Sequence, residues 1–221
     1  MSDVTVTVRG EHEARIAPER ATIRLSVRSD GPDRAAVVDQ VLRLAQPVRE
    51  SITDRAASGT VHDWSSTRLS VRAERPWNNE GKRLAPVYYA GIDFTATFSE
   101  ATELSLWVSD VSAWDGVEIG AVNWHLSAET RARIEREVAA AAVGVAVTRA
   151  GAYAGALGLE SVVPVEIADV GLISGPQGAS SAPVLKARGA AFAAADTAPG
   201  MAYEPDEIVV SATVEGRFLA R

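Results

Sequence analysis

Histidine and carboxylate side chains are the groups in this chain that could carry acid/base or metal chemistry. The three histidines are His12, His62 and His125, and none has the HxxxH or HExxH spacing that puts two imidazoles on one helix face. His62 precedes Asp63, but neighbours in a strand point to opposite faces, so the pair predicts no proton relay. His125 follows Trp124 just before a predicted helix, and we expect it to make hydrogen bonds while partly buried.

The carboxylates form two close pairs, Glu11 with Glu13 and Glu204 with Asp206. Pairs at this spacing in loops are usually solvated charge, so neither indicates a general acid and base. The sequence has no GxSxG, GxxxxGK[ST] or GxGxxG motif, and the lack of cysteine removes thiolate nucleophiles and cysteine zinc sites. We therefore predict no catalytic residue, no metal and no cofactor, in a protein that is not an enzyme.

Two aromatic residues are candidates for contact with a partner. Trp77 lies in the polar stretch "RPWNNEG", where an exposed indole could anchor a neighbour; folding back onto its own hairpin is an equal alternative. Phe192 lies in residues 174–206, which are rich in Pro, Gly, Ala and Ser and predict a long flexible loop. Core or sheet-face positions are expected for the other tryptophans, Trp64, Trp107, Trp114 and Trp124.

Apolar periodicity predicts the elements that must position these residues. "VTVTV" and "ATIRLSV" alternate at period two and are expected to pair as antiparallel strands. "TRLSVRAE" and "VYYAGIDFTATF" predict a long hairpin around the polar tip, and the three remaining strands are "VEIGAVNWHL", "SVVPVEIADVG" and "EIVVSATVEGRFLA". Helices are predicted after Pro32, over about 100–112 and over about 128–157.

The last of these helices is apolar enough to raise the question of a membrane span. Its second half, "VAAAAVGVAVT" followed by "AGAYAGALGL", contains Arg149 near the middle and is built from Ala and Gly, which contribute little insertion energy. We expect a core helix with Ser127 as N-cap and Gly158 as a left-handed C-cap, and no membrane span. The Gly151/Gly155 pair predicts close packing of its Ala/Gly face.

Charge and the N-terminal residues limit partners and location. The net charge is -7, and the basic residues are spread along the chain, so we expect no binding to nucleic acid. The first residues, "MSDVTVTVRG", have neither a basic region nor an apolar run, which predicts a cytoplasmic protein.

Three stretches resemble the SIMPL-domain proteins, which include periplasmic and secreted bacterial proteins of mostly unassigned function. They are "VTVRGEHEARIAPERATIRLSV", "VNWHLSAETRARIEREVAAAAVGVAVTRAGAYAGALGL" and "YEPDEIVVSATVEGRFLA". The resemblance covers nearly the whole chain, although Pro18-Glu19 stands where the family pattern usually has Pro-Asp. It implies an α+β fold, with a mixed or antiparallel sheet and helices packed on one side, in a single domain over residues 1–221. It supplies no catalytic residues.

The resemblance also implies a stress-related role and a tendency to form ring-like or channel-like homo-oligomers. The leading hypothesis is a non-enzymatic, self-assembling protein whose terminal strands offer an uncovered edge; alternatively, those strands pair with each other or lie inside the sheet. The competing hypothesis is a small-molecule binder or enzyme with a pocket near the hairpin tip, His125 and the 174–206 loop.

The composition of the 174–206 loop generates a stability prediction. Replacing residues 175–199 by a short Gly/Ser linker should leave the melting temperature nearly unchanged, because this stretch cannot bury enough apolar surface to offset its ordering. Thermal unfolding of the shortened protein checks this, and a large drop would mean that the loop docks, for example through Phe192.

Overall fold

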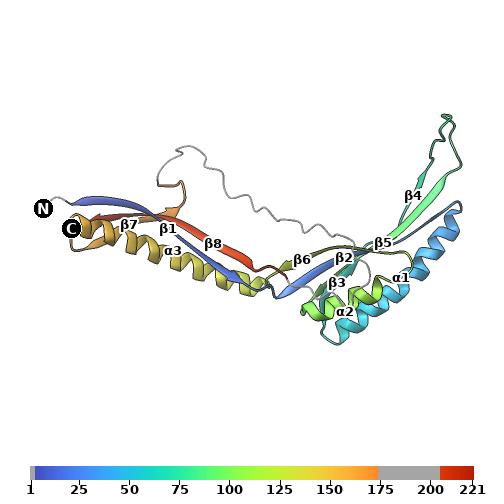
Figure 1. Ribbon diagram of the computed structural model, residues 1–221, viewed down its shortest axis with the longest axis horizontal. Coiled ribbons are helices and arrows are strands. Elements are labelled where there is room, and N and C mark those ends of the chain that lie inside the picture. Colours follow the sequence, from blue (N-terminus) through green and yellow to red (C-terminus); the bar gives the residue numbers. More distant parts are fainter. Residues whose placement is uncertain (1–2, 174–204) are drawn as a thin grey trace. The chain divides into compact units, whose positions relative to one another are not determined.

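A computed structural model describes residues 3–173 and 205–221, which form three helices and eight strands (Figure 1). Every strand pairing among these residues is antiparallel. The predicted α+β class is confirmed, with the strands divided between two sheets. In chain order the elements are β1 (Val4–Ile16), β2 (Arg20–Gly31), α1 (Arg34–Ala57), β3 (Val61–Ser66), β4 (Ser70–Glu74), β5 (Val87–Phe98), α2 (Ala101–Val111), β6 (Val117–His125), α3 (Ala128–Ala156), β7 (Val162–Asp169) and β8 (Ile208–Ala220).

The described residues group into two compact units. The terminal unit holds residues 3–17, 127–173 and 207–221, and therefore both terminal strands. The inner unit holds residues 18–126 with 205 and 206. Each unit has its own sheet and its own buried core. A single domain over residues 1–221 stays a prediction.

The sheet of the terminal unit has the order β1-β8-β7, with α3 packed along one face (Figure 1). β1 pairs with β8 over its full length, from Val4 opposite Ala220 to Ile16 opposite Ile208. The predicted pairing of "VTVTV" with "ATIRLSV" is wrong, because β2 pairs with β5 and β6 in the inner unit. Period-two alternation identifies the buried face of a strand but not its partner.

Gly10 is where β1 and α3 come closest. A Cβ atom at this position would press on the carbonyl oxygen of Ala142 and lie 2.7 Å from the backbone nitrogen of Ala146. Only a residue without a side chain allows the helix backbone to lie this near the strand. On its buried side the helix has small residues at every fourth position: Ala142, Ala146, Ala150 and Ala154.

The predicted close packing of Gly151 and Gly155 is wrong. Both are exposed, and a Cβ atom added at either would meet nothing within 4 Å. The buried row repeats every fourth residue from Ala142, and the two glycines fall beside that row. Helical periodicity with equally small residues on both sides does not show which side faces the sheet.

The ends of α3 agree with the sequence. The Ser127 hydroxyl accepts a hydrogen bond from the Thr130 amide at 3.2 Å, and Gly158 has φ +75° just after the helix. Within the described part of the chain, α3 alone has the length and apolar content of a membrane-crossing helix, which is weak evidence for a span. The expected absence of a span stays a prediction.

The inner unit is a five-stranded sheet in the order β3-β5-β2-β6, with β4 also paired to β5. Its core lies between the inward side chains of β2 and β5 and the helices α1 and α2, which cover one face (Figure 1). The predicted hairpin of β4 and β5 is confirmed, with Val71 opposite Ala90. Alternation along "VYYAGIDFTATF" also predicts an inward row on β5, from Tyr88 to Phe98. Tyr88 is half-buried, and the other members of the row are buried: Ala90, Ile92, Phe94, Ala96 and Phe98.

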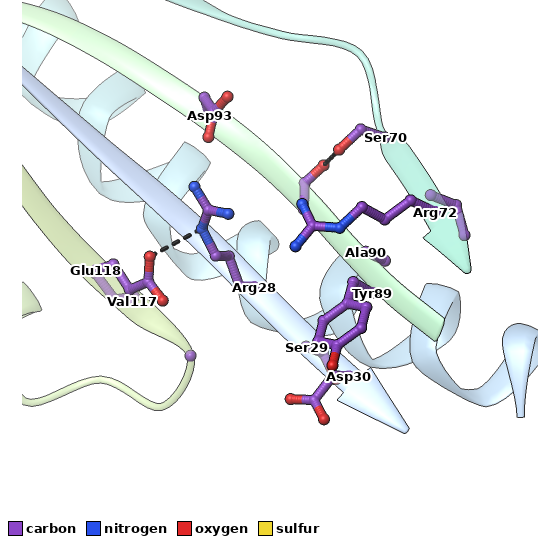
Figure 2. A pocket seen from close by; sticks show the side chains of 13 residues that line it. Arg28, Ser29, Asp30, Ser70, Arg72, Tyr89, Ala90, Asp93, Val117 and Glu118 are labelled. Atoms are coloured by element: carbon purple, nitrogen blue, oxygen red, sulfur yellow. Dashed lines mark hydrogen bonds and ion pairs between the residues drawn. The ribbon is translucent and has the colours of Figure 1, made fainter. Parts of the chain in front are cut away.

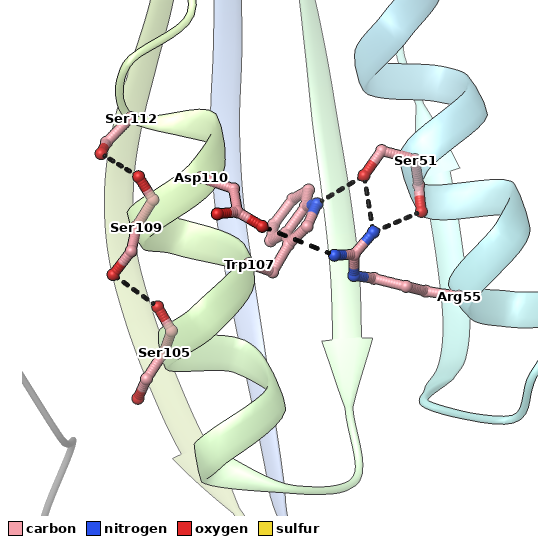
Figure 3. A network of polar contacts seen from close by, with 7 residues as sticks. All are labelled: Ser51, Arg55, Ser105, Trp107, Ser109, Asp110 and Ser112. Carbon is pink, nitrogen blue, oxygen red and sulfur yellow. Dashed lines mark hydrogen bonds and ion pairs between the residues drawn. The ribbon is translucent and has the colours of Figure 1, made fainter. Parts of the chain in front are cut away.

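Trp107 joins α2 to α1 and to the sheet (Figure 3). Its indole is fully buried, 5.1 Å from the ring of Phe98 between centroids, and its Nε1 donates to the Ser51 hydroxyl at 2.9 Å. Arg55 donates to the same hydroxyl at 2.8 Å and lies 4.0 Å from Asp110. Burying an indole requires a partner for its N–H, and Ser51 supplies that partner.

The contact at Gly10 generates a paired prediction with opposite signs. Gly10→Ala should destabilise the protein by about 2–3 kcal/mol, because the methyl group of the alanine would clash with the backbone of α3, which has no alternative rotamer. Gly151→Ala should stabilise it by roughly 0.5–1 kcal/mol, because the position is open and alanine favours a helix. Urea unfolding measures both changes, and equal effects of the two substitutions would contradict the packing described.

Candidate functional site

The three histidines lie on three different strands. His12 lies exposed on β1 in the terminal unit, while His62 lies on β3 and His125 on β6 in the inner unit. Across residues 3–173 and 205–221, no group of three or more histidine, aspartate or glutamate side chains could hold a metal ion. The hydrogen-bonding role predicted for His125 is confirmed, because its Nε2 lies 2.8 Å from the Thr22 hydroxyl and its Nδ1 3.1 Å from the Leu126 carbonyl oxygen.

The carboxylate pairs also lie in exposed positions where the structure describes them. The loop expected around Glu11 and Glu13 is wrong, because both lie in strand β1; they are exposed there, and Glu13 pairs with Arg15 at 3.2 Å. Asp206 is exposed, and its predicted neighbour Glu204 falls outside the described residues. The interpretation of Glu11 and Glu13 as solvated charge is thus supported by their position.

Trp77 is 60% exposed at the tip of the β4–β5 hairpin. The Arg83 guanidinium lies 4.9 Å from its ring centroid, and the two residues form an isolated β-bridge across the tip. The tip thus covers one face of the indole with its own arginine and leaves the rest in solvent. A contact with a partner through Trp77 stays a prediction, and Phe192 lies outside the described residues.

The face of the inner sheet opposite α1 and α2 is polar across several strands. On β2 the residues that alternate with the buried row are Thr22, Arg24, Ser26, Arg28 and Asp30. A chain of contacts crosses this face from β6 to β5: Glu118 to Arg28 at 2.8 Å, Arg28 to Ser26 at 3.4 Å, and Ser26 to Asp93 at 2.6 Å. Charged groups on this open face are therefore held in place by their neighbours.

An open groove of about 710 Å³ lies on this polar face (Figure 2). We call it the Gly91 groove, because Gly91 lies between Arg28 of β2 and Ser70 of β4 in the strand register. Its lining residues come from four strands and the turn before β6: Arg28, Ser29, Asp30, Ser70, Val71, Arg72, Tyr89, Ala90, Gly91, Asp93, Gly116, Val117 and Glu118. A groove with this lining suits a polar ligand rather than an apolar one.

Two arginines enter the Gly91 groove from the strands on either side of β5 (Figure 2). Arg28 is oriented through its Nε by Glu118 at 2.8 Å. Arg72 is oriented through its Nε by Glu74 at 2.9 Å, and its guanidinium lies 4.9 Å from the centroid of the Tyr89 ring. The remaining guanidinium N–H groups of both residues stay available as donors.

The Gly91 groove is not the pocket expected from the sequence. It adjoins the β4–β5 hairpin as predicted, but His125 is absent from its lining, and residues 174–204 lie outside the described part of the chain. The sequence did not predict this groove because its charged residues lie on the solvent side of their strands, where polar residues are ordinary. The signal that could have shown it is Gly91, a glycine in the middle of an otherwise good strand.

Two strand glycines of the inner unit should respond differently to a methyl group. A Cβ atom at Gly91 would meet nothing closer than 3.5 Å, whereas one at Gly120 would lie 2.8 Å from the Arg24 carbonyl oxygen. Gly91→Ala should therefore leave stability unchanged or raise it by up to about 1 kcal/mol. Gly120→Ala should lower stability by about 1–3 kcal/mol. Thermal and urea unfolding check both, and marked destabilisation by Gly91→Ala would contradict the open floor of the groove.

A model of a known protein family matches nearly the whole chain. The family described as "SIMPL: Protein of unknown function (DUF541)" matches residues 6–218, from β1 to β8. No curated protein matches the chain. Because the match spans both units and nearly the whole sequence, this chain belongs to the SIMPL (DUF541) family.

Proposed function

We propose that this SIMPL-family chain is a non-enzymatic protein that associates with copies of itself through the terminal unit. The observation that supports this is a run of exposed apolar side chains along β7 and the residues after it. Their exposed fractions range from 43% to 74%, and we call them the β7 surface: Val163, Val165, Ile167, Val170 and Leu172. Because the register with β8 shifts between Pro164 and Glu166, Val163 and Ile167 lie on opposite faces of this edge strand. Exposed apolar side chains gathered along an edge strand are typical of a protein contact.

A second copy of the chain is the occupant that best suits the β7 surface. Around a two-fold axis each copy would cover the other's apolar side chains with its own, so both surfaces leave water together. β7 is an edge strand, but Pro164 lacks a backbone N–H and the register with β8 shifts between Pro164 and Glu166. Contact through side chains is therefore favoured over extension of the sheet.

The route to association differs from the one expected from the sequence. The two terminal strands pair with each other, and β8 is the central strand, so the hypothesis of an uncovered edge is wrong for β8. β1 keeps one outer edge, where Arg149 of α3 donates to the Arg9 carbonyl oxygen at 2.6 Å. The stress-related role and the cytoplasmic location remain predictions.

Light scattering after size exclusion tests the β7 surface. At micromolar concentration the wild type should elute at a multiple of 23.3 kDa. The double substitution Val165→Glu and Leu172→Glu should shift it to the single-chain mass, because burying two carboxylates in an apolar contact is unfavourable. A wild type that is already monomeric would contradict the proposal.

The matched control places two glutamates at apolar positions of similar exposure in the inner unit. Leu42 and Leu106 are 49% and 55% exposed, on α1 and α2. The variant with Leu42→Glu and Leu106→Glu should keep the wild-type mass. Equal dissociation of both double variants would show a general effect of charge and overturn the assignment to β7.

A further inference from the structure

Gly91 is a glycine that the local fold does not need. It lies inside β5, where the pairing with β2 continues on both sides of it without a register shift and the pairing with β4 ends at it, opposite Ser70. No positive φ is found there, and the atoms nearest to an added Cβ are the Val27 carbonyl oxygen at 3.5 Å and the Arg28 Cγ at 3.6 Å, which is ordinary contact. A glycine inside a strand marks a bulge, a close backbone or an approaching ligand. Gly91 shows neither a register shift with β2 nor a backbone contact that a methyl group would block, so its open backbone is accessible to a ligand.

The side chains around Gly91 supply hydrogen-bond donors in fixed positions. Glu118 and Glu74 hold the Nε atoms of Arg28 and Arg72. Arg28 also donates from Nη2 to the Ser26 hydroxyl at 3.4 Å, so Arg72 and the other N–H groups of Arg28 are left as donors for another acceptor. Two guanidinium groups beside a strand backbone without a side chain can donate hydrogen bonds to the oxygens of a carboxylate or a phosphate. The Ser70 hydroxyl donates to the Gly91 carbonyl oxygen at 3.2 Å, which keeps its own lone pairs open.

The acidic residues of the groove narrow the class of ligand. Glu118 is engaged by Arg28 and Asp93 by the Ser26 hydroxyl, so both already have donors. Asp30 lies opposite Tyr89 in the register of β2 and β5, is exposed, and has no partner among the described residues. A plain anion would leave the Asp30 carboxylate as a repulsive neighbour, whereas a ligand with its own ammonium or hydroxyl donor would bond to it.

We propose that the Gly91 groove binds a small polar molecule that carries a carboxylate or phosphate together with an ammonium or hydroxyl donor. Arg28 and Arg72 hold the anionic group, the bare backbone at Gly91 lets it approach the sheet, and Asp30 accepts from the donor. This site lies in the inner unit and is independent of self-association through the β7 surface.

The experiment is a titration of the whole, isotope-labelled chain at constant ionic strength, followed by amide chemical shifts. The four probes are inorganic phosphate, glucose 6-phosphate, acetate and glycine. At least one donor-bearing probe, glucose 6-phosphate or glycine, should shift the amides of Gly91, Arg28 and Arg72 saturably. It should bind more tightly than the plain anion of the same charge type. The pair that responds distinguishes phosphate from carboxylate, and no saturable shift with any probe overturns the proposal.

Variants separate a built site from general attraction by charge. Arg28→Gln and Arg72→Gln should each weaken binding roughly tenfold or more, and Gly91→Val should abolish it by filling the floor while both arginines remain. Asp30→Asn should weaken the donor-bearing probe but strengthen the plain anion. Arg24→Gln removes the same charge from the same strand and face outside the groove, so it should change nothing. Equal losses with Arg24→Gln and Arg28→Gln would overturn the proposal, and the arginine variants decide it even if Gly91→Val fails to fold.

Discussion

The backbone of α3 lies so close to β1 that position 10 has no room for a side chain. The rest of the terminal unit follows from this contact. The helix can approach position 10 only with small residues, so its buried residues from Ala142 onward are alanines, whereas Ile134 and Val138 are buried nearer its start. A large side chain of this core, Phe218, comes from β8. A helix rich in alanine and glycine is then apolar by composition, and its packing on the sheet accounts for that composition. It also covers β1 and β8 better than β7, which leaves the β7 surface exposed.

Each unit places its helices on one face of its sheet, and this arrangement decides where binding can occur. In the inner unit the covered face is a closed apolar core sealed by Trp107 and Phe98, while the open face carries charged residues held by their neighbours. The described histidines lie on three separate strands, β1, β3 and β6. Recognition needs only fixed donors and a free surface, which the Gly91 groove and the β7 surface offer.

The elements of this fold could be predicted from the sequence better than their partners. The hairpin of β4 and β5, the inward row on β5 and the caps of α3 follow from local patterns that the structure repeats. The pairing of β1 with β8 joins residues about 200 positions apart, and no local pattern carries that information. Gly10 and Gly151 are both small residues in apolar surroundings, and only the packing shows that one is essential for contact and the other lies in solvent. The Gly91 groove could not be predicted for the same reason, because Arg28, Arg72 and Gly91 come together only when their three strands pair.

Hydrogen exchange of the α3 amides is the most direct test that this helix packs against β1. If the helix and the sheet form one cooperative unit, the amides of residues 142–154 should exchange as slowly as those of β8. Their protection should not change when phospholipid vesicles are added, because leaving the sheet would expose the buried row and Phe218 to water. Exchange of α3 much faster than β8 in buffer, or protection that appears only with vesicles, would contradict the account.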